Sequence, residues 1–237
     1  MRKYDYSETS QILRLLTRES GVVAALAKGS KKEKSSFGGA LDLFYLGPAV
    51  VLFRPRAGLH LLTAFTVEEA WPALRRDLKR FYLACHLAEI LTGMTREEEP
   101  LPGVFDLLVE GLTALSSAGD RSIPALGASL ELRLLAELGF APSLTACGSC
   151  GRELAGRERR LSVSFGGLIC ADCRDTEARP LTVGPGVVEA LRTLAASRPR
   201  TAARLRLSRA DQRAIRGFLT AFTEWRLERK LRTARFL

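Results

Sequence analysis

The first part of the chain alternates between short, largely apolar runs and turn residues. The run at 10–17 and the run at 21–29 are separated by the turn Arg-Glu-Ser-Gly, a spacing typical of a hairpin. Further short runs, punctuated by Gly or Pro, cover residues 38–47, 49–58 and 59–69. Five strands with no helix between most of them predict a small β-barrel, most economically an OB-fold, over residues 1–79.

The pattern then changes to apolar residues at helical spacing. From Leu74 through Leu78, Phe81 and Cys85, one face of the segment 70–94 is apolar, which predicts a helix. Similar segments, with Pro near the start of two and Gly139 as an expected stop, cover residues 101–118, 123–140, 184–197 and 209–229. The sequence therefore predicts an α+β multi-domain protein in which a helical domain, residues 80–237, follows the barrel.

Two Cys-x-x-Cys pairs interrupt the helical pattern. Cys147 and Cys150 form one pair and Cys170 and Cys173 the other, at a spacing typical of a structural zinc site. Four thiolates leave no open coordination position, so the expected cofactor is one structural Zn²⁺ per chain, held by residues 145–175.

Two other uses of the cysteines are less favoured. A thioredoxin-like redox motif would be a single pair opening a helix after a strand. Disulfides need an oxidising compartment, and the N-terminus shows no signal-peptide pattern.

Gly148 and Gly151 are expected to supply the positive φ angles that tight turns around a metal need. Cys85, in an apolar helical context, is expected to be core.

The net charge of the chain bears on the kind of partner that it binds. The 237 residues carry a formal net charge of +10, with 46% hydrophobic residues and no apolar run of membrane-spanning length. Such a balance is typical of a partner of nucleic acid or of an anionic membrane, and the distribution of the charge decides between this and an evenly solvated face. Together with the motifs given below, it leads us to expect a cytoplasmic, nucleoid-associated protein with no membrane contact and no small-molecule substrate.

The cations are clustered in two places. Lys28, Lys31, Lys32 and Lys34 follow the second predicted strand, and an arginine-rich stretch runs from Arg198 to the C-terminus. This segregation favours a polyanion-binding surface, for which DNA is the candidate partner, over an even solubilising coat, although a solvated hairpin tip is the plain alternative for the lysines. A third set can extend the basic track or pair with nearby Glu68, Glu69 and Asp77. Its members are Arg75, Arg76, Lys79 and Arg80.

Aromatic residues of the predicted barrel are candidate platforms for stacking on bases. The candidates are Phe37, Phe44, Tyr45 and Phe53, for each of which barrel core is the more common role. Chemistry for catalysis is sparse: His60 and His86 are the only histidines and lie in apolar contexts, and no P-loop is present. The sequence therefore predicts a protein that is not an enzyme.

Several motifs, taken in order, resemble the RecO family of bacterial recombination mediators. They are YSETSQILRLLTRESGVVAALAKGSKK, LTAFTVEEAW, LELRLLAELGFAPSLTACGSC, FGGLIC and the terminal LRTARFL. The resemblance covers the whole length. It implies an N-terminal OB-fold, a helical bundle and a zinc segment. It also implies binding of single- and double-stranded DNA, strand annealing, contact with the C-terminal tail of single-strand binding protein, and partnership with RecR to load the recombinase RecA.

The sequence-based hypothesis is therefore a non-catalytic DNA-binding and strand-annealing protein of recombinational repair after DNA damage. Two alternatives remain: a metal-dependent nucleic-acid enzyme whose cysteines only support the fold, and a zinc-containing transcription regulator. The second would need a base-reading recognition helix, and the arginine-rich last helix is the candidate.

Overall fold

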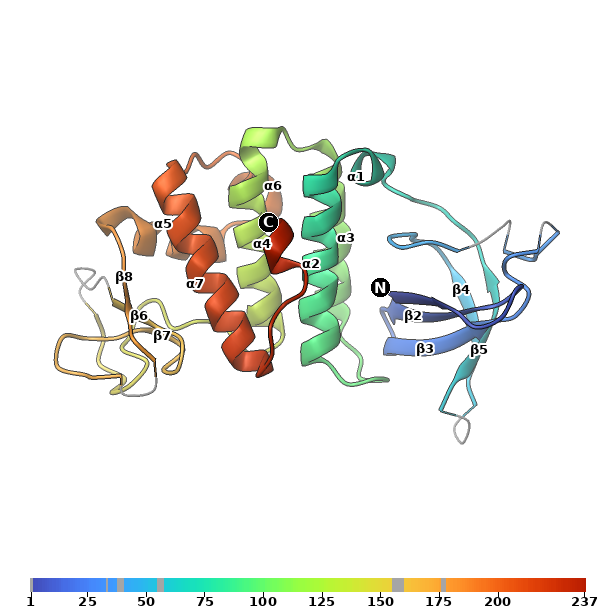
Figure 1. The fold of residues 1–237 in the computed structure, drawn as a ribbon, viewed down its shortest axis with the longest axis horizontal. Coiled ribbons are helices and arrows are strands. Elements are labelled where there is room, and N and C mark those ends of the chain that lie inside the picture. Colours follow the sequence, from blue (N-terminus) through green and yellow to red (C-terminus); the bar gives the residue numbers. More distant parts are fainter. Residues whose placement is uncertain (1, 33, 38–40, 55–57, 155–159, 176–177) are drawn as a thin grey trace.

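Three structural parts follow one another along an elongated molecule (Figure 1). The computed structural model describes the chain except residues 1, 33, 38–40, 55–57, 155–159 and 176–177. A β-sheet lies at one end, a bundle of helices in the middle, and a small sheet with the cysteines at the other end. The C-terminus returns to the middle of the molecule, against the bundle.

The N-terminal sheet has five strands in the order β1-β2-β3-β5-β4. Neighbouring strands are antiparallel except β3 and β5, which are parallel. The strands are β1 (Arg2–Asp5), β2 (Gln11–Thr17), β3 (Gly21–Ala27), β4 (Ala49–Leu52) and β5 (His60–Phe65). One face carries its own apolar cluster, which includes Leu13, Ala25 and Leu62, because alternate residues of each strand point to the same side.

Two sequence-based expectations for this sheet need correction. Within the described residues β1 and β4 do not pair, so a closed barrel is not confirmed. The predicted strand 38–47 is wrong over 41–47, which forms a loop with a single isolated bridge from Leu46 to Glu69. Phe44 has a left-handed backbone (φ 57°), which an extended strand cannot contain, so the strand is interrupted there.

The helix predicted over 70–94 is two helices, α1 (Pro72–Arg76) and α2 (Leu78–Met94). Asp77 separates them: its backbone is extended, and its side chain accepts a hydrogen bond from the N–H of Arg80, which makes it the N-cap of α2. The predicted helices at 101–118 and 123–140 are confirmed as α3 (Pro102–Ser117) and α4 (Ile123–Glu137). Gly139 follows α4 with φ +80°, the backbone expected of a helix stop.

The remaining helices complete the bundle. They are η1 (Asp120–Ser122), α5 (Pro185–Ala196), the short α6 (Pro199–Ala202), α7 (Arg209–Leu227) and η2 (Ala234–Phe236). Helix α4 is central and is buried along much of its length, with Leu126, Leu130 and Leu134 almost inaccessible to solvent. Since α2, α3, α5 and α7 all contact it or one another, one apolar cluster holds the bundle together.

A small three-stranded sheet in the order β7-β6-β8 lies between α4 and α5 in the chain. Its strands are β6 (Arg160–Ser162), β7 (Gly167–Leu168) and β8 (Leu181–Thr182). They are too short to carry a core of their own. Leu161, Leu168 and Val183 join the bundle's cluster, so this end of the molecule depends on the helices and on the cysteines beside it.

Candidate metal centre and nucleic-acid interface

The four paired cysteines meet in space. The sulfur atoms of Cys147, Cys150, Cys170 and Cys173 all lie within 4.8 Å of one another, and Cys150 Sγ is 4.0 Å from Cys170 Sγ. Tetrahedral coordination with metal–sulfur bonds of about 2.3 Å would place the sulfurs about 3.8 Å apart. The arrangement can therefore hold a metal ion with little adjustment.

Backbone hydrogen bonds shape the turn around the first pair. The N–H of Gly151 donates to the carbonyl of Cys147 (2.8 Å), and the N–H of Gly148 donates to the carbonyl of Leu168 (2.7 Å). Gly151 has the expected positive φ of +73°. Gly148 does not. It is required for a different reason, because a Cβ there would lie 2.1 Å from the carbonyl oxygen of Phe165.

The surroundings of Cys147 lower the pKa of its thiol. Burial opposes the thiolate, but N–H groups of Cys150, Cys170 and Ser149 stabilise it and lower the pKa of Cys147 to about 6. The N–H of Cys170 lies 3.4 Å from this sulfur. For Cys173 the Ser149 hydroxyl lowers the pKa, but the neighbouring sulfurs raise it to about 11. Four sulfurs this close repel as thiolates, which is the arrangement that a bound cation relieves.

Arg160, on β6, holds the backbone around the second cysteine pair by hydrogen bonds. The sequence analysis did not select this residue. Its guanidinium donates to the carbonyls of Cys170 (3.2 Å), Ala171 (3.3 Å) and Cys173 (3.2 Å). The segment is also tied to the bundle, since Arg192 Nε of α5 donates to the carbonyl of Leu144 (2.7 Å). The position of Arg160, ten residues before Cys170, gave no local signal, because the contact depends on the fold of β6 and β7.

The lysine cluster forms a turn directly after β3. Lys28, Lys32 and Lys34 are exposed and make no ion pair with any described residue, whereas Lys31 Nζ is 2.8 Å from Asp5 Oδ1. The N–H of Lys31 donates to the carbonyl of Thr9 (3.0 Å), which holds the turn against the connection between β1 and β2.

Two exposed tyrosines, which the sequence analysis did not select, flank Asp5, the ion-pair partner of Lys31, in the sequence. Tyr4 is 51% and Tyr6 63% exposed. Among the four aromatic residues selected from the sequence, Phe37 is buried and Phe44 makes an edge contact with Phe81. The ring of Tyr45 lies under the guanidinium of Arg75. Phe53 is exposed at 44% and contacts the ring of His60.

Two of the selected arginines make structural contacts. Arg75 donates to the carbonyls of Ala70 and Leu43 and lies over the ring of Tyr45, at 4.8 Å. Arg80 donates to the carbonyls of Leu115 (3.2 Å) and Ala118 (2.6 Å), and so caps the C-terminal end of α3.

Arg80 also pairs with Asp77 (2.7 Å) and Asp120 (3.0 Å). The other two members of the set, Arg76 and Lys79, are exposed, and neither pairs with an acidic residue in the described part of the chain.

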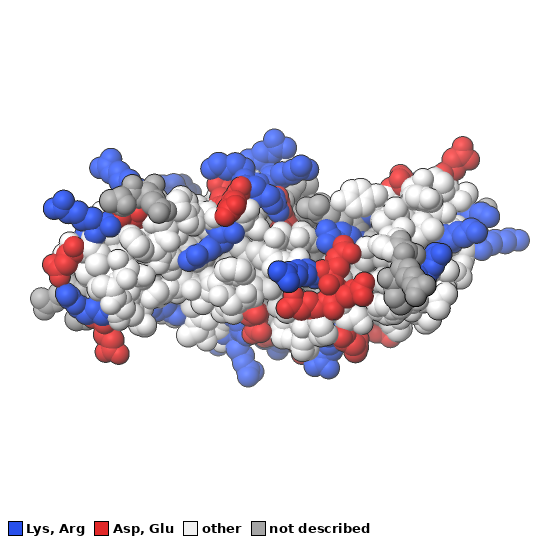
Figure 2. Space-filling view, turned by 90° about the horizontal axis from the view of Figure 1, so that it is seen from below, with Lys and Arg blue, Asp and Glu red and all other residues white. Residues whose placement is uncertain are grey.

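Some of the C-terminal cations form ion pairs and others are exposed, as in the set from Arg75 to Arg80. Arg229 pairs with Glu89 (3.2 Å) and Lys230 with Glu224 (2.7 Å). A further group is exposed on and before α7: Arg198, Arg200, Arg204, Arg206, Arg209 and Arg213. Figure 2 shows cations over the helices and at the far end of the sheet, with a group of carboxylates between them. Figure 1 places β3 in the sheet at one end of the molecule, and α6 and the start of α7 in the bundle, so the two basic regions of the sequence lie on different parts of the molecule.

Both histidines are buried and hydrogen-bonded. His60 Nδ1 accepts from the N–H of Arg54 (3.0 Å), and its Nε2 lies 2.9 Å from Glu98. His86 lies between Thr233 (2.9 Å) and Glu131 (3.3 Å). Cys85 is half-buried, and burial raises its pKa to about 11, so this thiol is unreactive.

A basic pocket of about 490 Å³ lies on the bundle. Lys79, Arg209, Arg213 and Arg216 line it together with apolar residues of α2, α4 and α7 such as Leu83, Ile123 and Leu219. Burial lowers the pKa of Arg216 from its ordinary value, and the Glu131 carboxylate opposes that shift.

Comparisons with known proteins agree over the whole chain. A family model described as "Recombination protein O N terminal" matches residues 1–71, and one described as "Recombination protein O C terminal" matches residues 75–235. A protein named DNA repair protein RecO from Anaeromyxobacter dehalogenans (strain 2CP-C) is 36% identical over 237 residues, which is 100% of this chain and 92% of that protein.

Two further relatives carry the same name. The protein from Pelotomaculum thermopropionicum is 34% identical and that from Moorella thermoacetica 32% identical; both matches cover 100% of this chain, and 90% and 87% of the relatives. The described helices include none that is long and apolar enough to cross a membrane. With both of its halves matched in order, the chain belongs to the RecO family.

Proposed function

We propose that this chain is a DNA-binding and strand-annealing protein of recombinational DNA repair. The observation that carries the proposal is the family match over the full length, with relatives named for DNA repair. The two basic regions, exposed at the turn after β3 and around α6 and the start of α7, support it, because annealing requires two mutually repelling polyanions to be neutralised and brought together.

The sheet and the lysine turn are the proposed site for single strands. We propose that the sheet is an OB-type barrel, which in general is five-stranded and partly open, in keeping with the strand order here. Lys28, Lys32 and Lys34 would neutralise phosphates, with Lys31 shared with Asp5. Tyr4, Tyr6 and Phe53 supply exposed rings for stacking.

The helical part offers the second DNA surface. Arg76 and Lys79 extend the basic track at its start, and the exposed arginines from Arg198 to Arg213 form the rest. Arg75 and Arg80 contribute mainly by holding the loop 41–48 and the end of α3. We propose one unit over residues 1–79 and a second over 80–237; the family models meet between 71 and 75.

The four cysteines are proposed to hold one structural zinc ion per chain within residues 145–175. The sulfur distances and the depressed pKa of Cys147 support a cation with thiolate ligands. The centre keeps the cysteine segment folded against the bundle and takes no part in a reaction.

The basic pocket on the bundle is the proposed site for the acidic, apolar tail of single-strand binding protein. Its arginines suit carboxylates, and the floor of Leu83, Ile123 and Leu219 suits an apolar side chain. Partnership with RecR and loading of RecA complete the proposed role, which belongs to the cytoplasm and the nucleoid.

An annealing protein and its two alternatives give different results in one experiment. Labelled single strands of several sequences, alone and with their complements, are incubated with the protein and Mg²⁺ or Mn²⁺. The proposal predicts duplex formation for every sequence and strands of unchanged length. Shortened strands would establish the metal-dependent enzyme, and strong preference for one duplex sequence would establish the transcription regulator.

A further inference from the structure

Four aromatic rings form a row that leads from the sheet to the surface of the bundle. Phe44 of the loop 41–48 makes an edge contact with Phe81 of α2, at 5.8 Å between ring centroids, and Phe81 makes one with Tyr82, at 6.2 Å. Tyr82 stacks on Phe236 of η2, with centroids 4.3 Å apart and planes 9° from parallel.

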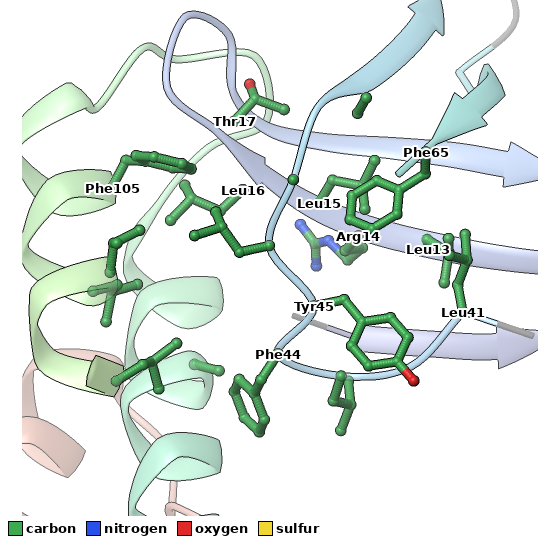
Figure 3. A pocket seen from close by; sticks show the side chains of 18 of the residues that line it. Leu13, Arg14, Leu15, Leu16, Thr17, Leu41, Phe44, Tyr45, Phe65 and Phe105 are labelled. Atoms are coloured by element: carbon green, nitrogen blue, oxygen red, sulfur yellow. The ribbon is translucent and has the colours of Figure 1, made fainter. Parts of the chain in front are cut away.

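The two ends of this row differ in exposure. Phe44, at the inner end, is half-buried and lines the cavity between the sheet and the helices (Figure 3). Phe236, at the outer end, is 43% exposed. Because Tyr82 covers one face of the Phe236 ring, the exposed area belongs to the other face and to the edge of the ring.

Hydrogen bonds at α2 hold the outer end of the row in place. The C-terminal segment returns to the bundle (Figure 1), where Thr233 donates its N–H (3.0 Å) and its hydroxyl (2.7 Å) to the carboxylate of Glu89. The Thr233 hydroxyl also lies 2.9 Å from His86 Nδ1. Since η2 begins directly after Thr233, the Phe236 ring is held on Tyr82 before any ligand binds, which reduces the ordering cost of binding.

Two cations flank the exposed ring. The guanidinium of Arg235 lies 4.6 Å from the centroid of the Phe236 ring, and Lys79 of α2 lines the same basic pocket as Phe236. Both cations are exposed, and neither forms an ion pair with an acidic residue in the part of the chain that the structure describes. Asp120, which also lines the pocket, pairs with Arg80 (3.0 Å). Positive charge beside an exposed ring suits a polyanion that also carries aromatic groups, and a single strand of nucleic acid has both.

We propose that Tyr82, Phe236 and the Arg235 guanidinium form a stacking platform for one unpaired base of single-stranded DNA, with Lys79 against a neighbouring phosphate. The inference rests on the proposed DNA-binding function and gives the helical part a preference among forms of DNA. A base in a duplex is already stacked and paired, and freeing it is costly. The platform therefore holds a single strand more tightly than the duplex, so this surface releases the product of annealing.

The test compares ordinary strands with abasic strands, which carry the same phosphates without bases. Fluorescence anisotropy measures the affinity of the full chain for a labelled oligodeoxythymidylate. Phe236→Ala should weaken this binding by at least about fivefold, because the stacking of one base is lost. The slope of log affinity against log salt should stay unchanged, since the ring carries no charge. An abasic strand and a duplex should each bind the variant and the wild type with affinities within about twofold.

Three further variants separate stacking from folding and from charge. Phe236→Trp keeps an aromatic face and should bind ordinary strands at least as tightly as the wild type. Trp225→Ala removes a ring of α7 that is 40% exposed and lies outside the row, and it should change the affinity by less than about twofold. Lys79→Gln should weaken ordinary and abasic strands alike and make the salt slope shallower by about 0.7. Circular dichroism checks that each variant is folded.

The possible failures are distinguishable. If Phe236→Ala binds ordinary strands as tightly as the wild type, or loses ordinary, abasic and double-stranded DNA to the same extent, no base stacks on the ring and the inference is wrong. If the variant keeps its affinity for DNA and loses an acidic, apolar peptide, the ring belongs to the neighbouring peptide site, which also overturns the inference. An intact chain that binds no DNA would overturn both the inference and the proposed function.

Discussion

At the scale of single residues, the structural-zinc proposal makes a prediction for each sulfur atom of the cysteine segment. Replacing Cys147 or Cys170 by Ser removes one buried ligand and leaves the other three thiolates with an incomplete cage. We predict loss of zinc from the purified protein, together with increased proteolysis of residues 145–175. Metal analysis and limited proteolysis measure both effects.

The control for this prediction is Cys85→Ser, which changes a half-buried thiol far from the cage. It should keep one zinc per chain and an intact segment. A protein that contains no zinc before mutation, or a Cys147→Ser variant with unchanged zinc content, would contradict the structural-zinc proposal.

A single carboxylate also anchors the C-terminal segment. Glu89 is 7% exposed and accepts hydrogen bonds from the N–H of Arg232 (3.0 Å), from the N–H (3.0 Å) and hydroxyl (2.7 Å) of Thr233, and from Arg229 (3.2 Å). Burial opposes its ionisation, but these donors outweigh burial and hold the pKa of Glu89 below its ordinary value.

This shift predicts a pH dependence of stability. Because the folded-state pKa is depressed, the contribution of Glu89 is complete above the unfolded value of about 4.3 and is lost as pH falls through the folded value. We predict that Glu89→Gln lowers the free energy of unfolding by about 1–3 kcal/mol at pH 7 and has a weaker acid dependence than the wild type. Denaturant unfolding at pH 7 and pH 3 measures this; a loss of stability equal at both pH values would refute it.

At the scale of elements, the lysine turn after β3 carries the sharpest DNA prediction. Replacing Lys28, Lys31, Lys32 and Lys34 by Gln should weaken binding to all single strands alike, because phosphates carry no sequence information. The slope of log affinity against log salt should become shallower by about 0.7 for each phosphate that the variant no longer neutralises. Fluorescence anisotropy at several salt concentrations measures both the affinity and the slope.

A matched control replaces Arg18 and Arg152, two exposed cations that pair with Asp106 and Asp172. Per charge removed, it should change the salt slope far less. If the lysine variant loses affinity with an unchanged slope, the turn acts through folding, and the phosphate-binding residues lie elsewhere.

Elements with strong periodicity or a stop signal were predictable from the sequence. Helices α3, α4, α5 and α7 and strands β2, β3 and β5 are confirmed within a few residues, because each has an apolar face of helical or strand period. The break at Asp77 had a local signal, a helix-capping residue, which the apolar spacing on either side concealed.

Elements defined by distant contacts were not predictable. The loop 41–48 contains enough apolar residues for a strand, but the left-handed backbone of Phe44 interrupts it and only one isolated bridge, Leu46 to Glu69, forms. Strand β1 is polar and pairs only at an edge. That the four cysteines come together followed from their spacing alone, whereas the roles of Arg160 and the exposed tyrosines depend on how separate strands meet.

The proposed site for the acidic tail, the basic pocket on the bundle, gives a prediction for the whole molecule. A peptide copying the acidic tail of single-strand binding protein should bind weakly, and more weakly as salt rises, because its carboxylates meet Arg209, Arg213 and Arg216. Arg213→Ala, at an exposed position, should weaken binding about tenfold. Calorimetry tests this, with Arg200→Ala as the control; equal effects of the two substitutions would place the tail elsewhere.

The central claim, that two basic regions on different parts of the molecule bring two strands together, is tested most directly by the annealing rate of labelled complementary strands. The account predicts faster annealing with the protein than without it. The rate should fall in the lysine-turn variant and also in a variant with Arg198, Arg200 and Arg204 replaced by Gln, with zinc content unchanged in both. No acceleration by the intact protein, or an annealing rate that neither variant reduces, would contradict the account.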